Sequence, residues 1–145
     1  KNTFLHQPFH SFYGYKSQLE FCQLLKNSRD LENAIEEIQA IRTEFYKEVK
    51  VPGDLNGFNE ELAKAGRVAD FLELGELFAK DALNREESCG GHFREEYQTP
   101  EGEAKRDKAF QYVAAWEHIG APKDARLHKE MLNYKYIEVK ERSYK

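Results

Sequence analysis

The residues best suited to chemistry in this 145-residue chain are gathered in one polar segment, residues 84–97. The segment reads NREESCGGHFREEY, so carboxylates, guanidinium groups, a thiol and an imidazole surround a pair of glycines. Loops that a rigid scaffold positions often carry function, which makes this segment the first candidate site. Its spacing alone favours a plainer interpretation, a helix end followed by a charged turn on the surface.

Two kinds of chemistry can be weighed from the spacing of Cys89 and His92. With His6 and His10 they could supply four zinc ligands, but the two pairs lie about 80 residues apart, whereas structural zinc sites draw on short paired motifs. Cys89 could also be a nucleophile with His92 as its base, yet no third group that would orient the histidine is identifiable. We therefore predict no metal ligands and no catalytic residues in this chain.

The glycines of the chain match no nucleotide-binding pattern. They form neither G-x-G-x-x-G after a strand nor a phosphate loop that ends in Gly-Lys-Ser/Thr. No cofactor-binding residue is predicted within the chain.

Two long helices are predicted to position the polar segment. Over residues 29–50, apolar side chains recur at spacings of three and four and leave charged residues on the other faces. Pro52-Gly53 ends that helix, because proline disfavours helical geometry in the residue before it. A second helix is predicted from about residue 59 to 87, and its apolar arc is wider than one face, as expected of a helix that is covered from two sides.

Shorter elements are predicted around this helix pair. Residues 1–15 are rich in aromatic side chains and are predicted to be irregular, whereas residues 16–27 have the spacing of a first helix. Ser28 is predicted to accept hydrogen bonds from the first amides of the next helix. The glycine pair after Cys89 is predicted to end the second long helix.

The tail changes to a period of two, which is typical of strands. Apolar and polar residues alternate over residues 110–117 and again over residues 132–136. We predict a two-stranded antiparallel pair whose connector holds Gly120 and Pro122, lying on the helices or on another domain, because a lone hairpin is marginally stable in water.

Bulk composition excludes several classes of protein. Apolar residues make up 40% of the chain and charged residues 33%, which is typical of a folded domain. The net charge of −4 argues against nucleic acid as a partner. No stretch approaches the roughly 20 apolar residues of a membrane span. Two cysteines make no disulfide framework and favour a reducing compartment. The start at Lys1 favours a fragment of a larger protein.

Residues 81–102, DALNREESCGGHFREEYQTPEG, carry a resemblance to a known family. They resemble the stretch A-x-x-R-x-E-S-R-G-A-H-x-R-x-D of the flavoprotein subunits of succinate dehydrogenase and fumarate reductase. The residues that match are Arg85, Glu87, Ser88, Gly90, His92 and Arg94. Cys89 stands where most of the family has arginine. The order of elements agrees as well, and the resemblance extends over residues 16–145 to a terminal RSY. The motif of L-aspartate oxidase is similar.

The resemblance implies a fold and an organisation. The fold is mainly α, a three-helix bundle like a spectrin repeat, followed by a loop and a small two-stranded antiparallel β-hairpin. Residues 1–15 would be an irregular segment, residues 16–91 the helical bundle, and residues 92–145 the loop, hairpin and tail. All three would belong to one domain that packs on the rest of a larger flavoprotein.

The resemblance also implies a function for that parent protein. It would bind FAD outside this chain and interconvert succinate and fumarate by hydride transfer, with the active-site residues on its own flavin-binding and capping domains. A membrane anchor and an iron–sulfur subunit would exchange electrons with quinone, which places the complex on the cytoplasmic face of the membrane. Here we expect an interdomain interface that uses Arg85, Glu87, Ser88, His92 and Arg94. The alternative from another class is an independent helical adaptor that binds a partner helix.

Overall fold

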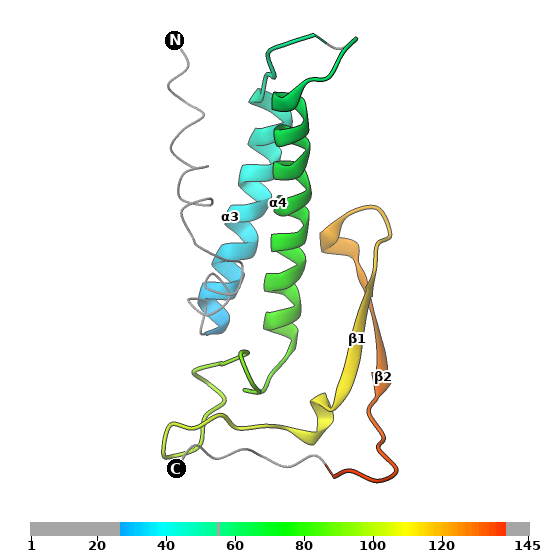
Figure 1. The fold of residues 1–145 in the computed structure, drawn as a ribbon. Helices are drawn as coiled ribbons and strands as arrows, with labels where there is room; N and C mark the ends of the chain where they lie inside the picture. The colour runs from blue at the N-terminus through cyan, green and yellow to red at the C-terminus, as the bar shows by residue number, and fades with distance from the viewer. Residues whose placement is uncertain (1–26, 55, 139–145) are drawn as a thin grey trace.

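Two long antiparallel helices and a β-hairpin make up the described part of the chain, residues 27–54 and 56–138, in a computed structural model (Figure 1). Helix α3 spans Ser28–Glu48 and helix α4 spans Glu60–Asn84. Strands β1, Tyr112–Glu117, and β2, Arg126–Met131, pair beside α4. The predictions of a mainly helical fold and of one antiparallel strand pair are confirmed. The described residues hold two α-helices, and the first helix of the predicted three-helix bundle, at residues 16–27, lies outside them except for Asn27.

Each long helix begins at an asparagine that caps it. The Asn27 side chain accepts a hydrogen bond from the Asp30 amide at 2.9 Å, and the Asn59 side chain accepts one from the Leu62 amide at 3.1 Å. Such caps satisfy amides that have no partner inside the helix. The prediction that Ser28 caps α3 is therefore wrong, since the cap lies one residue earlier and the Ser28 hydroxyl has another partner, described below. Neither described helix is long and apolar enough to cross a membrane.

The two helices pack through a short apolar seam with a polar network at its centre. Leu31, Ile38 and Leu72 are almost fully buried there. Glu76 of α4 is only 1% exposed, and its carboxylate accepts hydrogen bonds from Gln39 and Arg42 of α3. A buried carboxylate is tolerated only when such partners compensate for its lost hydration. The network therefore fixes the register of α4 against α3.

The hairpin differs from its prediction in one strand. Two 3-10 turns flank β1, namely η1, Lys108–Phe110, and η2, Pro122–Asp124. Gly120 adopts a φ of +119°, a conformation that side chains disfavour, so the chain already reverses before η2. The connector is as predicted, but the second strand begins at Arg126 rather than Leu132. The alternation around residues 132–136 does not mark burial, because Tyr136 is 86% exposed.

Polar contacts fasten the hairpin to α4. The Trp116 indole donates to Asp81 at 2.7 Å, and the Asn84 amide donates to the Tyr112 hydroxyl at 3.3 Å. The Lys80 ammonium donates to three carbonyl oxygens of the connector, those of Pro122, Lys123 and Ala125, at 2.8–3.3 Å. A two-stranded sheet is marginal by itself, so these contacts explain why it lies against the helix as the sequence required.

The buried network gives a first prediction. Replacing Glu76 by alanine leaves the Arg42 charge without its partner, and we expect a loss of about 3–5 kcal/mol in the free energy of unfolding, measured in urea. Glu36→Ala on the exposed face of α3 is the matched control and should change stability by less than about 0.5 kcal/mol. A Glu76→Ala variant as stable as this control would show that the network does not hold the helices together.

Candidate functional site

The polar segment begins where α4 ends, and the helix ends at Asn84 rather than near Glu87 as predicted. Helix α4 stops at Asn84, and Arg85 is already extended, with φ −88° and ψ 96°. The glycine pair therefore does not end the helix. Instead, Cys89 and His92 exchange backbone hydrogen bonds of 2.8 and 3.1 Å across Gly90-Gly91. Gly90 has a φ of +60° at the first central position, which favours glycine, so the pair closes a tight turn.

Arg94, just after this turn, joins opposite ends of the two helices. Its guanidinium is 1% exposed and donates to the Ala82 and Leu83 carbonyls in the last turn of α4, at 2.9 and 3.2 Å. It also donates to the Ser28 hydroxyl at the start of α3, at 2.6 Å. A cation at carbonyls that lack partners inside the helix is favourable, because the C-terminal end of a helix carries partial negative charge. One side chain thus holds the end of α4 against the start of α3.

Glu96, from the same segment, completes this junction at the start of α3. Its carboxylate accepts a hydrogen bond of 2.6 Å from the Ser28 amide and another of 3.3 Å from the Arg94 guanidinium. Partial burial raises the pKa of Glu96, but the hydrogen bonds from the Ser28 amide, from its own amide, from the Ser28 side chain and from Arg94 lower it to about 2. An anion at a helix N-terminus is stabilised by the free amides there.

Ser88 folds the segment back on itself. Its hydroxyl accepts from the Arg94 amide at 2.8 Å and donates to the Arg94 carbonyl at 3.1 Å, and the side chain is fully buried. The Ser88 amide donates to the Lys105 carbonyl at 2.9 Å. Ser88 therefore sets the position of Arg94 and binds the returning chain.

Arg85 and Glu87 connect the segment to the start of the hairpin. The buried Glu87 carboxylate accepts from Arg85 at 2.9 Å and from the Asp107 amide at 3.0 Å. Arg85 also donates to the Phe110 carbonyl at 2.9 Å and lies over the Tyr112 ring, 5.0 Å from its centroid. Each member of the Arg85–Glu87 ion pair thus also bonds to the backbone that leads into β1.

His92 makes a hydrogen bond to the backbone that fixes the orientation of its ring. Its Nε2 lies 2.9 Å from the Arg85 carbonyl, an acceptor, so this nitrogen carries the proton. The described residues contain no hydrogen bond between the Cys89 thiol and the imidazole, although Cys89 is a partly buried free thiol. They also contain no group of three histidine, cysteine or acidic residues that could hold a metal, and His6 and His10 lie outside them.

The five predicted interface residues come together in one junction. The interpretation of the segment as a charged surface turn holds for only part of it, where Glu86, Glu95 and the two glycines are exposed. Glu87, Ser88 and Arg94 are buried by the chain itself. Arg85 and His92 keep part of their surface exposed. The sequence did not point to Ser28 as the Arg94 partner, and no local signal could, because 66 residues separate them. The role of the five at an interdomain interface stays a prediction.

The junction lies within a range of residues that matches a known protein family. The family model described as "Fumarate reductase flavoprotein C-term" matches residues 17–144. A relative from Methanothermobacter marburgensis, named as one of the subunits of fumarate reductase (CoM/CoB), is 32% identical over 83 residues, which are 57% of this chain and 15% of that protein. The match thus spans less than a sixth of the relative's length. No solved structure matches the chain.

The junction predicts a large effect for one substitution. Arg94→Met keeps much of the side-chain volume but leaves two carbonyls of α4 and the Ser28 hydroxyl without their donor. We expect a loss of about 3–5 kcal/mol in the free energy of unfolding, measured in urea. The exposed Arg67→Met on α4 is the matched control, with an expected change below about 0.5 kcal/mol. Equal stability of the two variants would contradict the role given to Arg94.

The low pKa of Glu96 predicts a pH dependence of stability. Because the folded-state pKa is about 2 and the ordinary value is 4.5, the unfolded chain takes up the proton first as the pH falls. The stabilisation by Glu96 is therefore fully present above pH 4.5 and is lost as the pH falls toward 2. We expect the stability difference between the wild-type chain and Glu96→Gln to shrink over that range in denaturant titrations.

The control for this pH series is Glu86→Gln, since Glu86 is exposed and lies in the same segment. Its stability difference from the wild-type chain should stay flat over the same pH range. A Glu96→Gln difference that stays constant down to pH 2 would show that Glu96 does not stabilise the junction.

Proposed function

Because the chain belongs to the family of fumarate reductase flavoprotein C-terminal domains, we propose that it completes the fold of an FAD-dependent subunit that interconverts succinate and fumarate. The observation that carries this proposal is the family match over residues 17–144, which includes the whole junction between the helices. In this proposal the domain supplies structure and an interface, and the reacting groups belong to the remainder of the parent polypeptide.

The described residues do not fit FAD. A pyrophosphate is usually held by a glycine-rich turn at a helix N-terminus, yet the first turn of α4 carries Glu60 and Glu61, and the Ser28 amide at the start of α3 already binds Glu96. A hollow of about 240 Å³ beside α4 is bordered by Asp70 and Glu73, which would repel phosphate. We therefore assign FAD to the rest of the parent, and no step of the reaction to this chain.

The interface that we propose uses the exposed side of the junction. Glu87, Ser88 and Arg94 have partners within the chain and act by shaping the segment. Arg85 and His92 keep exposed surface, so they are the members of the five that can reach a flavin-binding or capping domain. Through its Nδ1, which has no partner among the described residues, His92 can accept a hydrogen bond from that domain.

Redox partners are a further part of the proposal. A membrane anchor that uses quinone, together with an iron–sulfur subunit, would place the parent at the cytoplasmic face of a membrane. The name of the Methanothermobacter relative instead ties that protein to CoM/CoB, so CoM/CoB stands beside quinone as a candidate. Both arrangements share a flavoprotein that acts on fumarate or succinate.

The test uses the full-length protein that contains this chain. We expect the purified protein to show flavin absorbance, and to reduce fumarate with a reduced viologen dye as electron donor or to oxidise succinate with an artificial acceptor. Arg94→Met should lower flavin content and turnover together, because it loosens a domain that packs on the flavin-binding part. Arg67→Met is again the control and should change neither.

Three outcomes would favour other functions. A protein without flavin and without turnover would support the helical adaptor instead. Oxidation of L-aspartate, with dioxygen or fumarate as acceptor, would identify the parent as an L-aspartate oxidase. If the His92→Ala and Arg85→Ala variants keep full flavin content and turnover, these residues do not contribute to an interdomain interface.

A further inference from the structure

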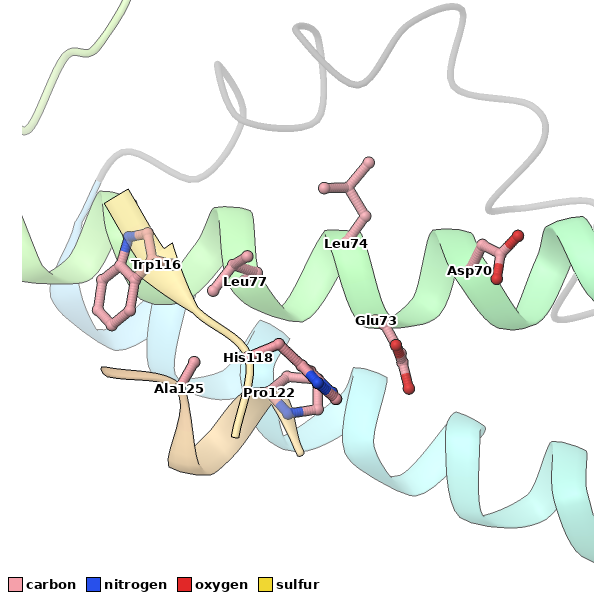
Figure 2. Close-up of a pocket in the computed structure, with 8 residues that line it drawn as sticks. All are labelled: Asp70, Glu73, Leu74, Leu77, Trp116, His118, Pro122 and Ala125. Atoms are coloured by element: carbon pink, nitrogen blue, oxygen red, sulfur yellow. The ribbon is translucent and has the colours of Figure 1, made fainter. Parts of the chain in front are cut away.

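A hollow of about 240 Å³ between α4 and the hairpin connector has the features of a binding pocket (Figure 2). Its more buried lining is apolar and comes from Leu77, Trp116 and Pro122. Its exposed border carries Asp70 and Glu73 of α4 and His118, one residue after β1. An apolar wall with a few polar groups at its border is the usual composition of a ligand pocket.

The two carboxylates at the border lack a counter-charge. Asp70 and Glu73 make no hydrogen bond or ion pair with any residue that the structure describes, and the side chains that line the hollow include no lysine or arginine. They are three residues apart on one helix, a spacing at which like charges repel each other. The nearby Lys80 ammonium is already bound by three carbonyl oxygens and lies over the Trp116 ring. A positively charged guest would relieve this repulsion.

An apolar stripe that the described residues leave partly exposed continues from the pocket along α4. Phe71, Leu74 and Phe78 are 39–44% exposed on the face beside it, and Leu74 also lines the hollow. Helical spacing places these three side chains in one row. An apolar row next to an acidic border has the composition of an interface with a partner surface that is apolar and carries a basic residue.

We propose that this pocket receives a lysine or arginine side chain from the remainder of the parent flavoprotein, an inference that rests on the proposed function. The apolar stem of such a side chain would lie along Leu77 and Trp116, and its charged head would reach Asp70 and Glu73. The match covers only 15% of the relative, so most of such a polypeptide lies outside this domain and can supply the side chain. A tether gives those residues a high effective concentration at the pocket.

The first test compares the accessibility of the carboxylates. Carbodiimide couples glycine ethyl ester to accessible carboxyl groups, and peptide mass spectrometry reads the extent at Asp70 and Glu73. We expect both to react in the 145-residue chain and about tenfold more slowly in the full-length parent, with equal rates once both proteins are denatured. Equal rates in the folded proteins overturn the proposal. Slow reaction already in the short chain also overturns it, since residues of this chain then fill the pocket.

The second test asks whether the guest is positively charged. The rate at which diethyl pyrocarbonate modifies His118 serves as the readout in the full-length parent. The double variant D70N/E73Q keeps the size of both side chains and removes their charges, so we expect the rate to rise about tenfold, to that of the short chain. The control variant E36Q/E37Q, on the exposed face of α3, should leave it unchanged. If His118 in the D70N/E73Q variant still reacts slowly with diethyl pyrocarbonate, the group in the pocket binds without the two charges. It is then apolar, and the proposal is overturned.

Failure of this inference and failure of the proposed function are distinguishable. Flavin content and fumarate reduction are measured on the same preparations, and neither D70N/E73Q nor E36Q/E37Q alters a residue of the junction. A parent with flavin and turnover but an accessible pocket overturns the pocket proposal alone. A parent without flavin overturns the proposed function.

Discussion

The position of every described element depends on how the end of α4 is held against the start of α3. Helix ends leave carbonyls and amides without partners, and a junction that buries both ends must satisfy them with side chains. Arg94 does so for the carbonyls of α4 and Glu96 for the Ser28 amide, and the two residues also bind each other. The charges match the two helix ends, since the cation lies at a C-terminus and the anion at an N-terminus.

From this junction the remaining contacts follow outward along α4. The Glu76 network sets the register of α4 against α3, and Lys80, Asp81 and Asn84 hold the hairpin on another side of the helix. The third side carries Phe71, Leu74 and Phe78 and has no cover among the described residues. The wide apolar arc predicted from the sequence thus divides into a seam with α3, a wall against the hairpin and a row that the described residues leave partly exposed.

The sequence was informative where local rules decide the structure. Periodicity predicted both long helices, and Gly120 with Pro122 predicted the hairpin connector. It was less informative where distant residues decide. The residue type of Ser28 predicts a capping role, but Asn27 caps the helix and the Ser28 hydroxyl binds Arg94. The burial of Glu87 and Arg94 was also missed, because charged residues around glycines usually mark solvated turns, and only tertiary contacts reverse that expectation.

These contacts also separate what the motif does from what the domain does. The matching residues at Glu87, Ser88 and Arg94 direct their polar atoms into the chain, so the pattern records how a junction is built rather than how a substrate is handled. A side chain that is buried by its own domain cannot also be the main contact with another one. In the proposed function and the pocket proposal, recognition of the remainder of the protein uses exposed groups, namely Arg85 and His92 at the junction and the acidic pocket beside the apolar stripe of α4. The buried junction keeps α4 in place, and α4 in turn places these two surfaces at a fixed separation. A partner that contacts both surfaces at once would therefore gain binding free energy from each, because the domain is already ordered and no entropy is lost in ordering it.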